Sequence, residues 1–199
     1  MKPATRRLLV MREWYAARGG EPQQQFGARS DLRAIPWPGR WLRVQPRAPM
    51  LETFRPLFDA VAGVELDDPA GARAELERRL DPRGAPAARI GQELRTLLAE
   101  GKIADRGAPP VRWSRVAKAG PETRDLSIDV VLMTGAGPRH RHPGGEANFC
   151  IALDGAPKFD GQEPGWVVFP PGSSHVPTVA GGTMLIVYLL PGGRIEFDR

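Results

Sequence analysis

The stretch GPRHRHPGGEANFC, residues 137–150, decides the fold, because it sets two histidines and an acid around a turn. His140 and His142 are two residues apart, so their side chains point to the same side of a β-strand. The Pro-Gly-Gly that follows is typical of a chain reversal. Glu146 then begins an apolar run that is typical of a second strand. The stretch therefore predicts two strands that bring both imidazoles and a carboxylate together.

The region around this stretch is a succession of short apolar segments, each closed by glycine or proline. Segments of this length and spacing are typical of strands in a β-sandwich or a small β-barrel. They are VRWSRVAK (111–118), LSIDVVLM (126–133), ANFCIALDG (147–155), GWVVFPPG (165–172), SHVPTV (174–179) and TMLIVYLLPGG (183–193), with RIEFDR (194–199) as a candidate last strand.

The segment before these strands has a helical period instead. Its apolar residues recur every three or four positions, which is typical of amphipathic helices packed on a core. Asp68 and Pro69 are typical of an N-cap followed by proline at the first helical position, and Gly101 is suited to end the last helix. The recurring residues are Leu51, Phe54, Leu57, Phe58 and Val61, then Ala72, Leu76 and Leu80, and last Ile90, Leu94, Leu97 and Leu98.

Together these patterns predict an α+β chain with three parts. Residues 1–49 form a basic extension, irregular or mobile, because no helix or strand period organises them. Residues 50–103 form a three-helix segment packed on the barrel. Residues 104–199 form the β-barrel, and its first residues, 104–110, are predicted to be a linker.

Charge and composition exclude several classes of partner. Residues 1–49 contain ten Lys/Arg and three acids, whereas the other 150 residues contain 18 Lys/Arg and 20 acids. A body this close to neutral lacks the basic surface that nucleic acid requires. No apolar run approaches the roughly 18 residues that cross a bilayer, and a lone cysteine, Cys150, fits a reducing compartment. We therefore predict a cytoplasmic protein with neither nucleic acid nor a membrane as partner.

The histidines are the candidate chemical centre. The chain has only three, and the third, His175, follows the turn-forming FPPGSS. Neutral imidazoles and a carboxylate converging on one point are ligands for one divalent metal ion, with Fe, Mn, Zn, Ni and Co all compatible. The alternative is that these histidines are structural and satisfied by hydrogen bonds in the core.

Two motifs at these residues resemble those of the cupins. The first, H-x-H-x3-E, is matched by His140, His142 and Glu146, and the second, P-x-G-x2-H, is matched by PPGSSH at residues 170–175. The resemblance implies a cupin-type double-stranded β-helix, or jelly-roll barrel. It also implies that the metal ligands are His140, His142, Glu146 and His175.

A narrower resemblance, over about residues 50–199, is to the 4-hydroxylaminobenzoate lyases of nitroaromatic breakdown. It is carried by RWSRVAKAGPETRDLSIDVVLMTGAGPRHRHPGGE (112–146) and QEPGWVVFPPGSSHVPTVAGGTMLIVYLLPGGRIEF (162–197). It implies an enzyme that turns 4-hydroxylaminobenzoate, or a related small aromatic hydroxylamine, into 3,4-dihydroxybenzoate and ammonia. That reaction adds one water and has no net redox change, so it needs neither a nicotinamide nor a flavin.

Roles follow for several residues. Glu146 and His140 are the candidate catalytic residues, and Glu146 either stays a ligand or detaches to act as a base. The metal would act either as a Lewis acid on the N–O group or by lowering the pKa of a bound water. Candidate substrate contacts are two cations for an aromatic carboxylate, two side chains on the face of Glu146, and two aromatic walls: Arg115, Lys118, Asn148, Cys150, Trp166 and Tyr188.

Two other functions fit the same residues. An Fe(II) cupin dioxygenase acting on an aromatic acid would use the same four ligands, with open positions for oxygen. A ligand-sensing cupin would instead regulate transcription through its helices and basic extension. A homodimer is a further candidate, because edge strands of small barrels often pair.

Overall fold

The computed structural model describes residues 48–197. Of the extension predicted at residues 1–49, residues 1–47 lie outside this range, and the last two belong to the first described helix. The described chain has three α-helices, α2 (Ala48–Val61), α3 (Pro69–Arg79) and α4 (Ala85–Ala99), followed by a strand-rich region. The predicted α+β class, with helices before a barrel of the jelly-roll type, is confirmed.

The strands form two antiparallel sheets. The larger has the order β1-β2-β3-β8-β5-β6 and the smaller the order β7-β4-β9. The bounds are β1 (Arg106–Ala108), β2 (Val111–Ala117), β3 (Leu126–Met133), β4 (His140–His142), β5 (Glu146–Phe159), β6 (Gly165–Phe169), β7 (Ser173–His175), β8 (Val179–Pro191) and β9 (Glu196–Phe197), with a short 3-10 helix, η1, at Pro121–Thr123. Strand β1 lies inside 104–110, so the prediction of a linker there is wrong.

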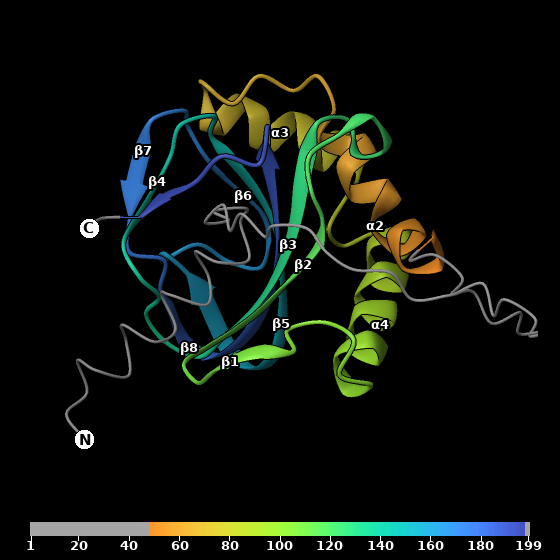
Figure 1. Ribbon diagram of the computed structural model, residues 1–199, viewed down its shortest axis with the longest axis vertical. Helices are drawn as coiled ribbons and strands as arrows, with labels where there is room; N and C mark the ends of the chain where they lie inside the picture. Colours follow the sequence, from red (N-terminus) through yellow and green to blue (C-terminus); the bar gives the residue numbers. More distant parts are fainter. Residues whose placement is uncertain (1–47, 198–199) are drawn as a thin grey trace, which may run out of the picture.

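The middle of the larger sheet is buried on both faces. Figure 1 shows β4 and β7 on one side of it and the helices on the other. Along β8, Leu185, Val187 and Leu189 pack in the core shared with the helices. Ile186 and Tyr188 alternate with them and pack in the second core, inside the barrel. The sheet therefore separates two apolar cores.

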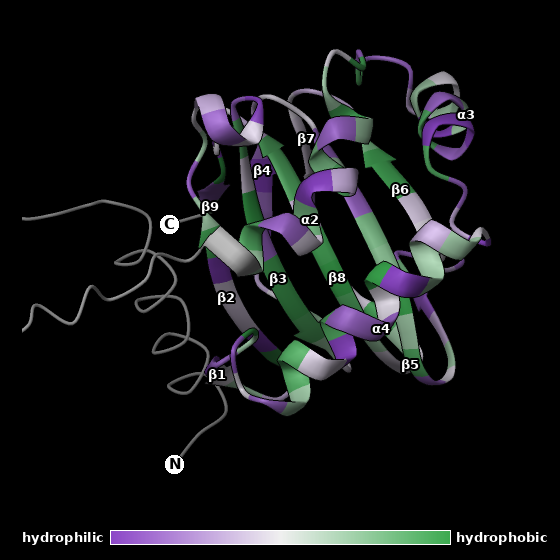
Figure 2. Cartoon of the chain, turned by 90° about the vertical axis from the view of Figure 1, so that its right-hand side faces the viewer, coloured by the Kyte–Doolittle hydropathy of each residue, from purple (hydrophilic) through white to green (hydrophobic). Residues whose placement is uncertain are grey.

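The helices cover the outer face of the larger sheet. Figure 2 shows α2 and α4 lying across β3, β8 and β5, with α3 near β6. Helix α3 begins as predicted, since the Asp68 carboxylate accepts the amide of Ala70 at 3.1 Å and Pro69 takes the first helical position. Phe54, Leu57 and other apolar side chains of the helices are fully buried against the strands. None of the helices within residues 48–197 has the length and apolar character that a bilayer span requires.

Candidate metal centre

The histidines are placed by two short strands of the smaller sheet. In β4, His140 and His142 are buried and face inward, while Arg141 between them is exposed. Strand β7 pairs with β4 so that His175 lies directly opposite His140. Glu146, which is fully buried, begins β5 of the larger sheet. The alternation of a β-strand thus brings three imidazoles and one carboxylate to one point between the sheets.

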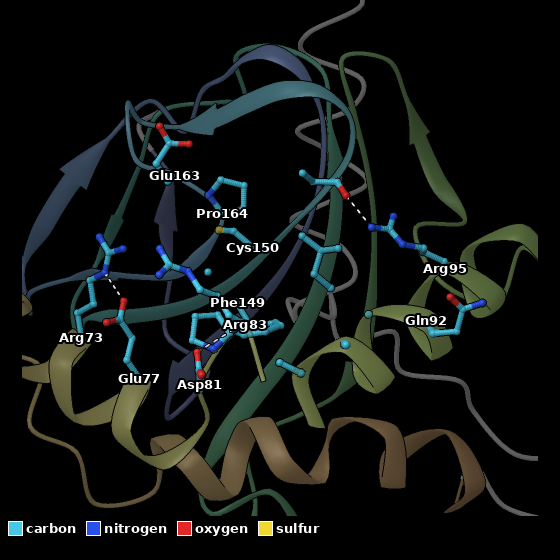
Figure 3. Close-up of a pocket in the computed structure, with 17 residues that line it drawn as sticks. Arg73, Glu77, Asp81, Arg83, Gln92, Arg95, Phe149, Cys150, Glu163 and Pro164 are labelled. Carbon is cyan, nitrogen blue, oxygen red and sulfur yellow. Dashed lines mark hydrogen bonds and ion pairs between the residues drawn. The ribbon is translucent and has the colours of Figure 1, made fainter. Parts of the chain in front are cut away.

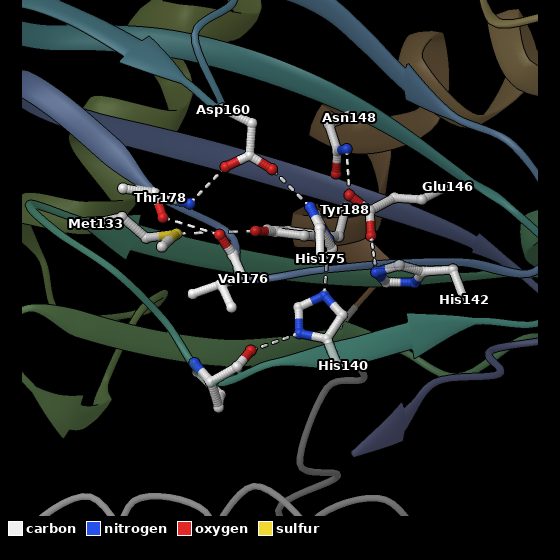
Figure 4. Close-up of polar contacts among 11 residues, drawn as sticks. Met133, His140, His142, Glu146, Asn148, Asp160, His175, Val176, Thr178 and Tyr188 are labelled. Carbon is white, nitrogen blue, oxygen red and sulfur yellow. Dashed lines mark hydrogen bonds and ion pairs between the residues drawn. The ribbon is translucent and has the colours of Figure 1, made fainter. Parts of the chain in front are cut away.

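The four side chains meet closely. One ligand atom from each of His140, His142, Glu146 and His175 lies within 4.8 Å of all the others. The Nε2 atoms of His140 and His175 are 3.0 Å apart. The Nε2 atom of His142 is in direct contact with a carboxylate oxygen of Glu146. Figure 4 shows the rings of His140 and His175 pointing toward each other beside this contact.

Hydrogen bonds on the far side of two rings fix their tautomers. The Nδ1 of His140 is 2.9 Å from the carbonyl oxygen of Pro138, and the Nδ1 of His175 is 2.6 Å from a carboxylate oxygen of Asp160. Both oxygens are acceptors, so each Nδ1 carries the proton and each Nε2 presents its lone pair. Two lone pairs 3.0 Å apart repel each other, and a cation between them removes that repulsion.

Burial sets the protonation states that a metal requires. Burial lowers the pKa of His140 to about 3, against the opposing effect of the Glu146 charge. Burial by itself would raise the pKa of Glu146, but His142 and the other two imidazoles outweigh it and lower that pKa. A neutral imidazole and an ionised carboxylate are the ligand forms of both groups. The donor set therefore fits a divalent ion.

A buried amide holds the carboxylate in place. The Nδ2 of Asn148 donates to the Oε1 of Glu146, and both side chains are fully buried. Within residues 48–197, the Oε2 of Glu146 and the Nδ1 and Nε2 of His142 have no hydrogen-bond partner of acceptable geometry. Buried polar atoms without partners are rare, and a cation would satisfy Oε2 and Nε2 together.

The family model described as PnbB, 4-hydroxylaminobenzoate lyase, matches residues 52–197. The chain belongs to the 4-hydroxylaminobenzoate lyase family. A 4-hydroxylaminobenzoate lyase of Pseudomonas putida is 33% identical over 149 residues, and the match covers 64% of this chain and 85% of that protein. One of Nocardioides sp. (strain LMS-CY) is 30% identical over 142 residues, with 64% and 83% covered. The resemblance seen in the sequence and its implication of an enzyme, a lyase, are confirmed.

Solved structures are more distantly similar to this member of the lyase family. A cupin-like protein of Thermotoga maritima is 16% identical, with a TM-score of 0.35, and the match covers 48% of this chain and 85% of that one. An RmlC-like cupin of Ralstonia eutropha is 14% identical, with a TM-score of 0.34, and 46% and 62% are covered.

Arg115 and Lys118, the two cations predicted to bind the substrate carboxylate of this lyase-family chain, both lie away from the metal centre. Arg115 faces the carboxylate of Asp129, with Nε 2.9 Å from Oδ1 and Nη2 3.5 Å from Oδ2. In the sheet, cross-strand partners lead from Arg115 on β2 through Asp129 on β3 and Tyr188 on β8 to Asn148 on β5, a distance of three strands. That puts the Cα of Arg115 about 14 Å from the Cα of Asn148, at about 4.8 Å per strand. Lys118 is exposed just beyond the end of β2.

The predicted apolar contacts divide between the two faces of the sheet. Tyr188 and Cys150 pack in the core inside the barrel, on the same side as the metal centre. The pKa of the Cys150 thiol is raised well above its usual value, first by burial and then by the charges of Glu146 and Asp160. Trp166 lies on the other face, where its Nε1 donates to the carbonyl oxygen of Leu80 at 2.9 Å. The expectation that Trp166 lines the histidine pocket is therefore corrected.

Sequence reasoning overlooked three residues at the centre. Asp160 bonds His175, and the ring of Phe197 lies 5.6 Å from that of His140 between centroids. Val176, next to His175, is a large apolar side chain that is 42% exposed. Asp160 had a signal as the Asp of an Asp-Gly turn, whereas nothing in the sequence marked Phe197 or Val176.

A groove of about 640 Å³ lies on the helical side of the sheet. Figure 3 shows Arg73 and Glu77 at its rim, paired with each other, and Arg95 bonded to a strand carbonyl. From β5 it is lined by Phe149 and Ile151, which pack in the core shared with the helices. The groove is not the site of the histidines, because the side chains of β5 that reach the histidines leave the sheet on the opposite face.

Proposed function

We propose that this chain is a metal-dependent lyase that releases ammonia from 4-hydroxylaminobenzoate, or a related aromatic hydroxylamine, and forms 3,4-dihydroxybenzoate. The observation that carries the proposal is the cluster of His140, His142, Glu146 and His175, whose ligand atoms lie within 4.8 Å of one another. Membership of the 4-hydroxylaminobenzoate lyase family supports a lyase reaction and this substrate class.

The ligands in this proposal are the Nε2 atoms of the three histidines and one oxygen of Glu146. A divalent cation held by them would supply Lewis acidity, either to the N–O group of the substrate or to a water whose pKa it lowers. The carboxylate of Glu146 is restrained on both sides, by Asn148 at Oε1 and by His142 at Oε2. We therefore assign Glu146 and His140 to holding the ion, with Asn148 as the residue that orients Glu146.

The substrate approaches from the side of His175 in this proposal. His175 is the partly exposed member of the cluster, while His140, His142 and Glu146 are buried. Phe169 lies beside His175, with ring centroids 4.5 Å apart, and is only half-buried. An aromatic ring would pack there against apolar surface, which includes Val176, while its hydroxylamine faces the ligands.

Ammonia release is the assay that tests this function. The purified chain is loaded with Fe, Mn, Zn, Ni or Co in turn, and ammonia and 3,4-dihydroxybenzoate are measured with and without a chelator. The reaction should need the ion and should proceed without O2, because it has no net redox change. Activity that requires O2 would indicate a dioxygenase instead, and full activity in a chain stripped of metal would refute metal dependence.

A matched pair of variants locates the activity in the cluster. His142→Ala should abolish turnover and metal binding, because it removes a buried ligand. Arg141→Ala changes the adjacent residue of the same strand, which is exposed and bonded to Glu196. It should keep both properties. Equal loss in the two variants would show that damage to β4, rather than loss of a ligand, explains the result.

A further inference from the structure

We propose that Asp160 is a positioning residue that fixes the tautomer of His175 and thereby keeps the metal centre open for its ion. This inference rests on the metal centre of the proposed function. It adds a residue that the two motifs do not contain, and it concerns the metal-free chain as much as the loaded one.

The carboxylate of Asp160 has two fixed donors. Its Oδ2 accepts from the Nδ1 of His175 at 2.6 Å, and its Oδ1 accepts from the backbone amide of Thr178 at 2.6 Å. The side chains of Asp160 and His175 are only 16% and 12% exposed. Figure 4 shows Asp160 between these two donors, on the far side of the His175 ring from His140. Such a carboxylate orients a ligating imidazole and raises its basicity.

The turn after β5 places this carboxylate. Phe159 and Gln162 exchange two backbone hydrogen bonds of 2.9 Å, which closes a two-residue turn. Both turn residues have left-handed backbone angles, with φ of +47° at Asp160 and +79° at Gly161. Asp-Gly and Asn-Gly are the pairs that such turns favour. An aspartate here thus serves the turn with its backbone and His175 with its side chain, and the two roles are separable.

The tautomer matters because His140 and His175 face each other. With its proton on Nδ1, His175 presents a lone pair toward the Nε2 of His140 at 3.0 Å, so the two nitrogens cannot bond to each other. With its proton on Nε2, His175 would donate a hydrogen bond across the same 3.0 Å. That bond would compete with the ion for both imidazoles. Asp160 excludes it by holding the proton on the other nitrogen.

Substitution by asparagine reverses this choice while keeping the turn. The backbone amide of Thr178 can only donate a hydrogen bond, so the single amide oxygen of the new asparagine must accept it. The NH2 group of that side chain then faces the Nδ1 of His175, which must become an acceptor. His175 can satisfy this only by moving its proton to Nε2. Asp160→Asn should therefore produce the tautomer that bonds His140.

The first measurement is made without metal. Long-range 1H–15N NMR of the metal-free, untagged chain at pH 8 distinguishes the two tautomers, and the assignment is simple because the chain has three histidines. The wild type should show His175 with its proton on Nδ1, and Asp160→Asn should show it on Nε2. A wild type with the proton on Nε2, or a variant that keeps it on Nδ1, would overturn the inference.

The second measurement is metal affinity, by competition with a chromogenic chelator. Asp160→Asn and Asp160→Gly should bind about 10–100-fold more weakly than the wild type, with unchanged circular dichroism because both residues suit the turn. Asp154→Asn is the matched control, since the Oδ1 of Asp154, on β5, also accepts a backbone amide, that of Thr183 at 3.1 Å, but bonds no histidine in the described chain. It should bind as the wild type does.

Each result has a distinct meaning. Wild-type affinity in Asp160→Asn, or an equal loss in Asp154→Asn, would overturn the role of Asp160. A wild type that shows the Nδ1 tautomer but releases no ammonia when loaded would count against the proposed reaction and leave Asp160 as the residue that sets the tautomer.

Discussion

Removing Arg115 should destabilise the fold strongly, because its partner would remain as a buried charge. The side chains of Arg115 and Asp129 are 12% and 2% exposed, and their atoms meet at 2.9 Å. The hydroxyl of Ser127 adds one more bond to Asp129, at 3.2 Å. In Arg115→Met the methionine keeps the apolar stem, so the main change is the loss of the guanidinium from a carboxylate that water hardly reaches.

The magnitude follows from that burial. Breaking a buried ion pair by removing one partner lowers the free energy of unfolding by about 3–5 kcal/mol. For a chain of this size, about 3 kcal/mol corresponds to a fall in Tm of roughly 6–12 °C. Arg55→Met is the matched control, because Arg55 bonds Glu52 with two contacts of 2.8 and 2.7 Å but both side chains are exposed. It should leave the urea midpoint nearly unchanged.

Urea unfolding followed by circular dichroism measures these changes, with Arg115→Met/Asp129→Asn as the third variant. The double variant also removes the buried carboxylate charge, so it should be more stable than Arg115→Met alone. The reasoning is refuted if Arg115→Met is as stable as the wild type, or if Arg55→Met loses as much. The double variant also shows whether Arg115 serves a substrate carboxylate, because a raised KM in a folded chain would come from the missing guanidinium.

Three further predictions concern Trp166, Val176 and Cys150. Trp166→Phe should lower the free energy of unfolding by about 1–3 kcal/mol, since the hydrogen bond to the Leu80 carbonyl is lost. Its metal affinity should not change, and weaker metal binding would show that the two faces of the sheet are coupled. Val176→Asp should raise KM at least several-fold with Tm unchanged, whereas Ala156→Asp, a change at another exposed residue, should alter neither quantity. The same KM in both variants would show that the substrate does not pass Val176. Cys150 should resist thiol reagents at pH 8 in the folded chain and react fully in urea, because burial raises its pKa; rapid labelling of the native chain would contradict its burial.

The sequence predicted those parts of the site that depend on local spacing. A spacing of two residues puts His140 and His142 on one side of any strand, and the helical period located the three helices to within a few residues. Strand β6 gave no such guidance about faces, since it is buried on both sides and its side chains do not alternate in polarity. That is why Trp166, in the wholly apolar run GWVVF, was assigned to the wrong side.

Other features depend on contacts that are distant in sequence. The partner of Arg115 is fourteen residues away, and the pairing of β2 with β3 shifts register between Arg115 and Ala117. Neither fact follows from a local pattern. The bond from Asp160 to His175 likewise requires the turn after β5 to approach β7. Strand β1 was missed because it is three exposed residues whose only regularity is their pairing with β2.

The ligands come from both sheets, and this has a mechanical consequence. The smaller sheet consists of three strands of only two or three residues each, and it carries all three histidines, while the carboxylate belongs to the larger one. A bound ion would therefore act as a cross-link between the two walls of the barrel, and its binding energy would contribute to keeping the barrel closed. Catalytic competence and mechanical integrity of this wall would then be gained, and lost, together.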